Sequence, residues 1–143
     1  MSAPIMAPQA ALAALIVLIL GLVPAAGAET PAQPMTFYVA SGGLDSCGKG
    51  CDHWIAAEGQ IDAAAALRFR KFLQRIKDRN LPIYFASPGG NVDQAIAMGN
   101  MLRERGAVAR VGRTVVNECG FEAQDGQACA RLKQSGRELH SDR

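Results

Sequence analysis

The residues best suited to chemistry are Ser87-Pro88-Gly89-Gly90, which close the stretch LPIYFASPGGN. The apolar and aromatic residues before them have the length and composition of a buried strand, and a helix is expected to follow. Because glycine accepts backbone conformations that other residues avoid, the amides of Gly89 and Gly90 can face a ligand where a helix N-terminus favours negative charge. The stretch therefore predicts an anion or oxyanion site. A plain strand-to-helix turn is the other interpretation, since sharp turns use the same residues.

The cysteines form two local pairs in the sequence. Cys47 and Cys51 lie in the glycine-rich loop SGGLDSCGKGC, and Cys119 and Cys129 bracket the loop CGFEAQDGQAC. In an oxidising compartment two local disulfides are the simplest pairing. The alternative is a metal site formed by Cys47, Cys51 and His53, but the spacing of these residues is only marginally typical of zinc. We predict the disulfides Cys47–Cys51 and Cys119–Cys129, with no metal and no cofactor.

An acyl-transfer enzyme also needs a nucleophile and a base, and few residues qualify. His53 could act as a base, but a histidine that leads into a strand beside a loop is more often a surface residue. Lys133 and Ser135 could mimic a serine–lysine pair. Ser135, however, precedes Gly136 in a polar stretch and is more typical of a helix stop. We therefore predict no catalytic residue in this sequence.

The N-terminal residues predict export. Residues 1–28 carry no charged side chain and contain an apolar run of about 14 residues, as in a secretory signal peptide. The predicted organisation is a signal peptide at 1–28, a linker at 29–35 and one domain at 36–143. An uncleaved membrane anchor is the alternative, because the extreme N-terminus offers only its terminal amine as positive charge. Both interpretations place the domain outside the cytoplasm, either in the periplasm or in the secreted fraction.

The overall charge excludes few partners. The chain has 143 residues, 49% of them hydrophobic, and a net charge of +2, which is too small to imply a polyanionic partner. The clearest predicted helix spans residues 62–80 and carries a basic stripe away from its apolar face. The stripe consists of Arg68, Lys71, Arg75 and Arg79. We interpret it as a solvated helix face and expect no nucleic-acid partner.

The order of elements predicts an α/β domain. Strands are predicted at 36–40, 53–57, 81–86 and 107–111, and a second helix, capped by Asn91, at 92–105. Strand, helix, strand, helix, strand in succession implies parallel pairing with right-handed crossovers. The expected core is therefore a parallel β-α-β-α-β unit. Residues 128–134 are expected to form one or two helical turns, and 135–143 are polar and expected to fray, so the layer is incomplete at the C-terminus.

A strand that ends in Ser87-Pro88-Gly89-Gly90, preceded by a long helix starting at Ile61-Asp62 and followed by an alanine-rich helix and a short strand, resembles the Clp protease and crotonase superfamily. The sequence is most similar there to exported proteins of the signal peptide peptidase A kind and to uncharacterised periplasmic relatives, over about residues 54–112. The resemblance implies that Gly89 and Gly90 supply N–H groups to an oxyanion hole. It also implies a serine nucleophile after the next strand, where this sequence has Gly112-Arg113-Thr114 and the cysteine loop.

Two functions are compatible with these observations. The first is a non-catalytic exported Clp/crotonase-like domain with a peptide or protein ligand. The alternative is a serine peptidase or hydrolase of the signal peptide peptidase A type, truncated before its nucleophile. Members of the superfamily commonly assemble through sheets and helices, and an incomplete layer would expose apolar surface, so we also expect self-association. Membrane contact is expected only through an uncleaved N-terminal segment.

Overall fold

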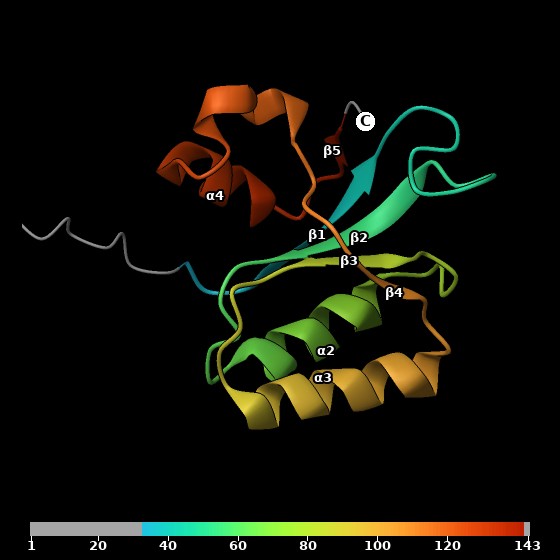
Figure 1. The fold of residues 1–143 in the computed structure, drawn as a ribbon, viewed down its shortest axis with the longest axis vertical. Helices are drawn as coiled ribbons and strands as arrows, with labels where there is room; N and C mark the ends of the chain where they lie inside the picture. Colours follow the sequence, from blue (N-terminus) through green and yellow to red (C-terminus); the bar gives the residue numbers. More distant parts are fainter. Residues whose placement is uncertain (1–32, 142–143) are drawn as a thin grey trace, which may run out of the picture. The chain divides into compact units, whose positions relative to one another are not determined.

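In the computed structural model, residues 33–141 are described and form a five-stranded mixed sheet with helices on both faces (Figure 1). The strands are β1 (Thr36–Ser41), β2 (His53–Glu58), β3 (Ile83–Ala86), β4 (Ala109–Val111) and β5 (Leu139–His140). The strand order is β4-β3-β2-β1-β5. Strands β2, β3 and β4 are parallel, β1 is antiparallel to β2, and β5 is parallel to β1. The predicted α/β class is confirmed, whereas the predicted signal peptide at 1–28 and most of the linker lie outside the described residues.

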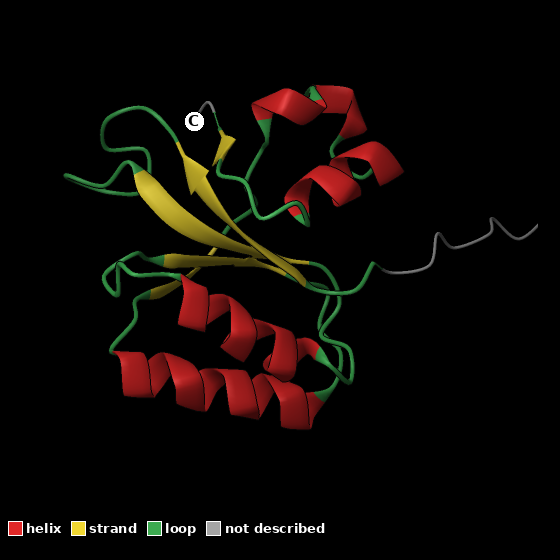
Figure 2. Cartoon of the chain, turned by 180° about the vertical axis from the view of Figure 1, so that it is seen from behind, coloured by secondary structure: helices red, strands yellow, loops and turns green. Residues whose placement is uncertain are grey.

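The helices divide between the two faces of the sheet. The α-helices are α2 (Ala65–Arg75), α3 (Val92–Arg105) and α4 (Gln127–Lys133), and the 3-10 turns are η1 (Asn117–Cys119) and η2 (Phe121–Ala123). Helices α2 and α3 connect the parallel strands and lie side by side on one face, while α4 and the 3-10 turns lie on the other (Figure 2). None of the helices within residues 33–141 is long and apolar enough to cross a membrane.

Two apolar cores form because successive side chains of a strand point to opposite faces. In β1, Phe37 packs toward α2 and α3, with its ring centroid 4.9 Å from that of Phe69, whereas Tyr38 packs toward the opposite face. In β2, Ile55 and Trp54 divide in the same way. Strands β1 and β2 are therefore buried on both faces, which requires helices on both faces of the sheet as well.

The prediction of a helix over residues 62–80 is wrong at both ends. The helix begins only at Ala65, with Ala64 at its N-cap, because the Asp62 carboxylate accepts the N–H of Ala64 at 3.0 Å in a separate turn before the helix and is also bound by Arg68. At the other end Ile76 adopts an extended conformation and packs against the core beneath α2. Tertiary contacts of Asp62 and Ile76 thus shorten the helix to Ala65–Arg75. The helix predicted at 92–105 is confirmed, with the Asn91 side chain accepting the N–H of Gln94 at 3.0 Å.

The prediction of a frayed C-terminal segment at 135–143 is also wrong for residues 139–141. Leu139 lies in β5 opposite Ala40 of β1 and is only 1% exposed, and the N–H of Ser141 donates to the carbonyl of Ser41 at 2.8 Å. A two-residue strand gives no periodicity to detect, and a single leucine in a polar stretch gives little hydrophobic signal. Its burial depends on Trp54 and the other residues that share its core.

A substitution at Gly99 tests whether α3 is open on its outer side. A Cβ at Gly99 would meet no atom within 4 Å, and alanine is more stable than glycine inside a helix by about 0.5–1 kcal/mol. Gly99→Ala is therefore expected to raise the free energy of unfolding by about that amount, measured by urea denaturation. Gly106→Ala is the control, because Gly106 has a φ of 66° and its substitution should destabilise the fold instead. Destabilisation by Gly99→Ala would show that another surface packs against this residue.

Candidate functional site

The carboxyl ends of β2, β3 and β4 lie at the same edge of the sheet, where parallel sheets usually bind ligands. A cavity of about 260 Å³ opens there between Pro88, which follows β3, and Glu58, which ends β2. Arg113 and Asp125 also line it and form an exposed ion pair at 2.5 Å. The structure thus places the predicted Ser-Pro-Gly-Gly motif beside two acidic residues and one basic residue that come from other parts of the chain.

The Ser87-to-Gly90 turn is held against the loop that follows β2. The N–H of Ile61 donates to the carbonyl of Gly89 at 2.9 Å, and the N–H of Asn91 donates to the carbonyl of Ile61 at 2.7 Å. Gly89 and Gly90 have positive φ angles of 107° and 143°, which favour glycine. A Cβ on Gly90 would lie 2.2 Å from the carbonyl oxygen of Ile61. Gly90 is therefore required by a close backbone approach.

The two predicted oxyanion-hole donors differ in their present partners. The N–H of Gly89 donates to the hydroxyl oxygen of Ser87 at 3.1 Å. The N–H of Gly90 makes no hydrogen bond to any residue between 33 and 141, and Gly90 itself is exposed. The N–H of Gly90 is thus available to an oxyanion at this turn, whereas the N–H of Gly89 must first break its hydrogen bond to Ser87. The role of Gly89 and Gly90 in an oxyanion hole stays a prediction.

A buried ion pair lies next to the turn. The Nζ of Lys133 in α4 donates to Glu58 Oε2 at 2.7 Å, and the two side chains are only 8% and 12% exposed. The other carboxylate oxygen of Glu58 accepts the backbone N–H of Thr114 at 2.9 Å. The hydroxyl of Thr114 accepts the indole N–H of Trp54 at 2.8 Å. Four residues from β2, α4 and the segment after β4 therefore form one connected polar network.

Tyr38 and Gln124 complete the surroundings of this network. Burial, and then the negative charge of Glu58, raise the pKa of Tyr38 far above its usual range, so its hydroxyl stays protonated. The Nζ of Lys133 lies 5.8 Å from the centroid of the Tyr38 ring. The side-chain amide of Gln124 bonds both the N–H and the carbonyl of Val116, at 2.9 and 2.7 Å. The Gln124 side chain thus satisfies both backbone groups of Val116 beneath α4.

Sequence reasoning missed the network formed by Glu58, Thr114 and Lys133. Glu58 and Lys133 are 75 residues apart in the chain, and no local pattern joins them. The only available signal was the position of Glu58 at the end of a predicted strand, where side chains of parallel sheets gather. A basic residue at the end of α4 gives no such signal, because lysine is common in the last turn of a helix.

The predicted disulfides are confirmed. Cys47 pairs with Cys51 and Cys119 pairs with Cys129. The alternative of a metal site at Cys47, Cys51 and His53 is therefore wrong, since both sulfur atoms are bonded to each other. No cluster of metal-binding side chains occurs within residues 33–141. The second disulfide closes the loop between η1 and α4 and so fixes the segment that carries Lys133.

The remaining candidates lie away from the turn. His53 begins β2, at the end opposite Glu58, and its ring nitrogens lie 2.6 Å from Asp52 and 3.2 Å from Glu138. The hydrogen bond that the His53 ring donates to the Asp52 carboxylate raises the pKa of His53. Its role as a base for this turn is not supported, because β2 separates it from Gly89.

The proposed pairing of Ser135 with Lys133 is not formed. The amine of Lys133 is bound to Glu58 and also lies 3.4 Å from the carbonyl of Gln124. Ser135 is exposed, and its hydroxyl accepts the N–H of Arg137 at 3.4 Å. A lysine that acts as a general base must be neutral, whereas this amine is held against a buried carboxylate.

Comparisons with protein-family models, with characterised proteins and with solved structures gave no match for this chain. The resemblance to the Clp protease and crotonase superfamily consequently stays a prediction from the sequence.

The two glycines of the turn are expected to respond differently to substitution. Gly89→Ala adds a Cβ that meets nothing within 4 Å and should cost only the strain of a positive φ, about 1–3 kcal/mol. Gly90→Ala adds the same strain and also forces the Ile61 carbonyl away, so it should cost at least about 3 kcal/mol. Urea denaturation of both variants measures the difference. Equal losses would contradict the assignment of Gly90 to a close backbone contact.

Proposed function

We propose that residues 36–143 form an exported Clp/crotonase-like domain that binds a peptide or protein segment and does not catalyse acyl transfer. The observation that carries this proposal is the state of Thr114, which occupies the region where the resemblance would place a nucleophile. Thr114 is 1% exposed, and its hydroxyl accepts a hydrogen bond from Trp54. A nucleophile needs both a base and access to substrate, and neither is available to this hydroxyl.

The buried ion pair supports the same proposal. Glu58, which accepts the N–H of Thr114, forms an ion pair with Lys133, so neither side chain is free to accept a proton. A cavity of about 260 Å³ lies beside Pro88, and Gly90 in the same turn is exposed. This combination suits recognition of a peptide backbone without attack on it.

The proposed location is the periplasm or the secreted fraction, with a membrane-anchored form facing the periplasm as the alternative. The two disulfides are consistent with an oxidising compartment. The predicted signal peptide at 1–28, which would direct export, lies outside the described residues.

A fluorophosphonate probe tests the absence of acyl-transfer chemistry. The probe labels activated serines, so the exported chain is expected to remain unlabelled under conditions that fully label a known serine hydrolase. Ser135→Ala and Ser87→Ala are the matched variants for any labelling that does occur. Labelling that disappears in one of these variants, and is absent from heat-denatured protein, would contradict the proposal and identify the nucleophile.

A serine hydrolase of the signal peptide peptidase A type is the second candidate, with a nucleophile supplied by residues that follow this sequence. The observation in its favour is the exposure of β4, where Val111 is 94% exposed and has no strand on its outer side within residues 33–141. Another strand would cover this edge in a longer protein. A downstream in-frame segment with an apolar strand and a serine among small residues would favour this candidate.

We also propose that the chain self-associates through this side of the domain. Val92 and Ile96 of α3 are 69% and 58% exposed, in addition to Val111 of β4. Exposed apolar side chains beside an unpaired strand edge favour contact with a second copy.

Light scattering of the exported chain should therefore give a molecular mass above that of a monomer. Val111→Lys is expected to shift the chain toward monomer, because a charge on an edge strand opposes pairing. Leu44→Lys is the control, since Leu44 is 84% exposed but lies in the first cysteine loop. A monodisperse monomer for the unmodified chain would contradict self-association, and an equal effect of both variants would exclude the β4 edge.

A further inference from the structure

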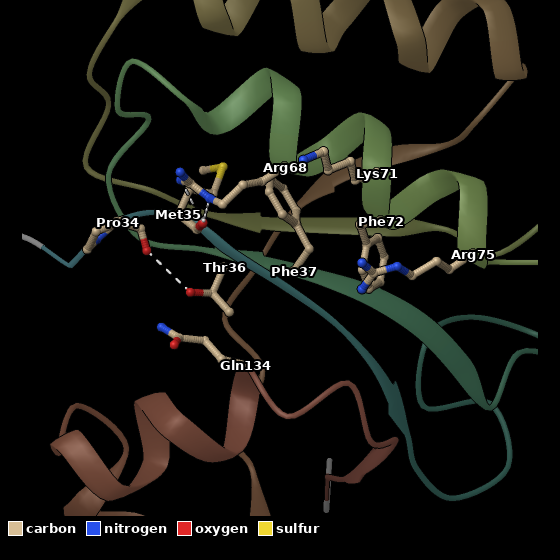
Figure 3. A pocket seen from close by; sticks show the side chains of 9 residues that line it. All are labelled: Pro34, Met35, Thr36, Phe37, Arg68, Lys71, Phe72, Arg75 and Gln134. Carbon is tan, nitrogen blue, oxygen red and sulfur yellow. Dashed lines mark hydrogen bonds between the residues drawn. The ribbon is translucent and has the colours of Figure 1, made fainter.

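A groove of about 380 Å³ lies toward the edge of the sheet opposite β4, between the outer edge of β1 and helix α2 (Figure 3). We propose that this β1 groove binds an acidic peptide segment in an extended conformation, as an added strand. The proposal rests on the proposed function and deepens it by naming the binding surface and the ligand chemistry. The residues that line the groove are Pro34, Met35, Thr36, Phe37, Arg68, Lys71, Phe72, Arg75 and Gln134.

The edge of β1 offers backbone groups to an added strand. The N–H of Gly42 donates to the carbonyl of Asp52, and hydrogen-bonded pairs recur at every second residue of an antiparallel ladder. The even-numbered residues of β1, in line with Gly42, therefore bond β2. Phe37 is odd-numbered, so its N–H and carbonyl point away from β2. Strand β5 pairs only with Ala40 and Ser41. Within residues 33–141 no strand pairs with the preceding part of β1 on this side, so the outward backbone groups near Phe37 can accept an added strand.

The charges of the groove select an acidic ligand. Arg68 is neutralised by Asp62 and also donates to the carbonyl of Met35 at 3.0 Å. Lys71 and Arg75 are exposed and form no salt bridge with any residue in the described part of the chain. Both side chains project from α2 over the β1 edge (Figure 3). Two uncompensated positive charges beside an open strand edge thus favour a carboxylate on the incoming segment.

The floor of the groove adds apolar contact. The ring centroid of Phe37 lies 6.0 Å from that of Phe72, and Phe72 is only partly buried. In an added strand alternate side chains point to opposite faces. One set would face Phe72, Lys71 and Arg75, and the other set would face Gln134 at the end of α4. The expected ligand therefore carries acidic residues at every second position, on the face toward Lys71 and Arg75, since alternate side chains give the specificity in strand addition.

Fluorescence anisotropy with a labelled peptide of alternating glutamate and valine tests this inference on the full chain with both disulfides formed. Binding is expected, and Lys71→Glu combined with Arg75→Glu should weaken it about tenfold or more. The control combines Arg70→Glu with Arg79→Glu, which makes the same change in charge but lines a different groove, between α2 and α3. This control should change the affinity by less than about twofold.

Two altered probes separate strand addition from simple charge attraction. A peptide of the same sequence with N-methyl groups on its pairing edge keeps its charge but loses backbone donors, and it should bind about tenfold more weakly. Bound unmodified peptide should also slow hydrogen exchange at the N–H of Phe37. Equal binding of both peptides, or equal binding of oligothymidine of the same charge, would overturn the inference.

The remaining outcomes distinguish the inference from the proposed function. No binding of the glutamate–valine peptide up to about 1 mM would overturn the inference. Equal loss of binding in the two double variants would also overturn it, because net charge alone would then explain the effect. Binding that is insensitive to Lys71 and Arg75 but is lost in Arg113→Ala would place the peptide at the cavity beside Pro88, so the inference would fail while the proposed function stands. Fluorophosphonate labelling would contradict the proposed function whatever the groove binds.

Discussion

The buried ion pair between Glu58 and Lys133 is the interaction on which the α4 side of the domain depends. Burying two charges is costly, and their attraction offsets the cost only when the remaining polar atoms also find partners. Here the second oxygen of Glu58 is bound by the Thr114 amide, and the amine of Lys133 also lies near the carbonyl of Gln124. Loss of one partner would leave an uncompensated charge, at a cost of about 3–5 kcal/mol. The pair therefore fixes α4 above the carboxyl end of β2.

The same pair determines what the turn at Ser87 to Gly90 can do. A hydrolase needs a nucleophile and a base beside its oxyanion donors, and the charged side chains of Glu58 and Lys133 near this turn are bound to each other. The need for glycine at position 90 is explained without catalysis, because Gly90 packs against the Ile61 carbonyl. The motif is thus explained first as a junction between β3 and α3. A role for it in an oxyanion hole stays a prediction.

Local sequence signals predicted those parts of the fold that local interactions determine. The Asn91 cap and the Gly106 stop define α3, and the short spacing of the cysteines defines both disulfides. The errors arose where distant residues decide the outcome. Leu139, for example, becomes a strand residue because β1 offers it an edge and a core.

The candidate site was less predictable than the fold for the same reason. The turn at Gly89 and Gly90 is contiguous in sequence and could be found, whereas the groove beside β1 joins residues from β1, α2 and α4. The basic stripe on α2 was interpreted as a solvated face. That interpretation treats the four basic residues as equivalent, but Arg68 is neutralised whereas Lys71 and Arg75 face an open strand edge.

A sheet that is covered on both faces leaves its edges as the places for recognition. In this domain the two edges differ in chemistry, because β4 ends in an exposed valine and β1 lies beneath two basic side chains. Apolar contact suits a second copy of the chain at β4, and positive charge suits an acidic segment at β1. Since β3 and β2 lie between these edges, both contacts can form at once. Assembly and ligand binding can then be altered independently, by substitutions on different strands.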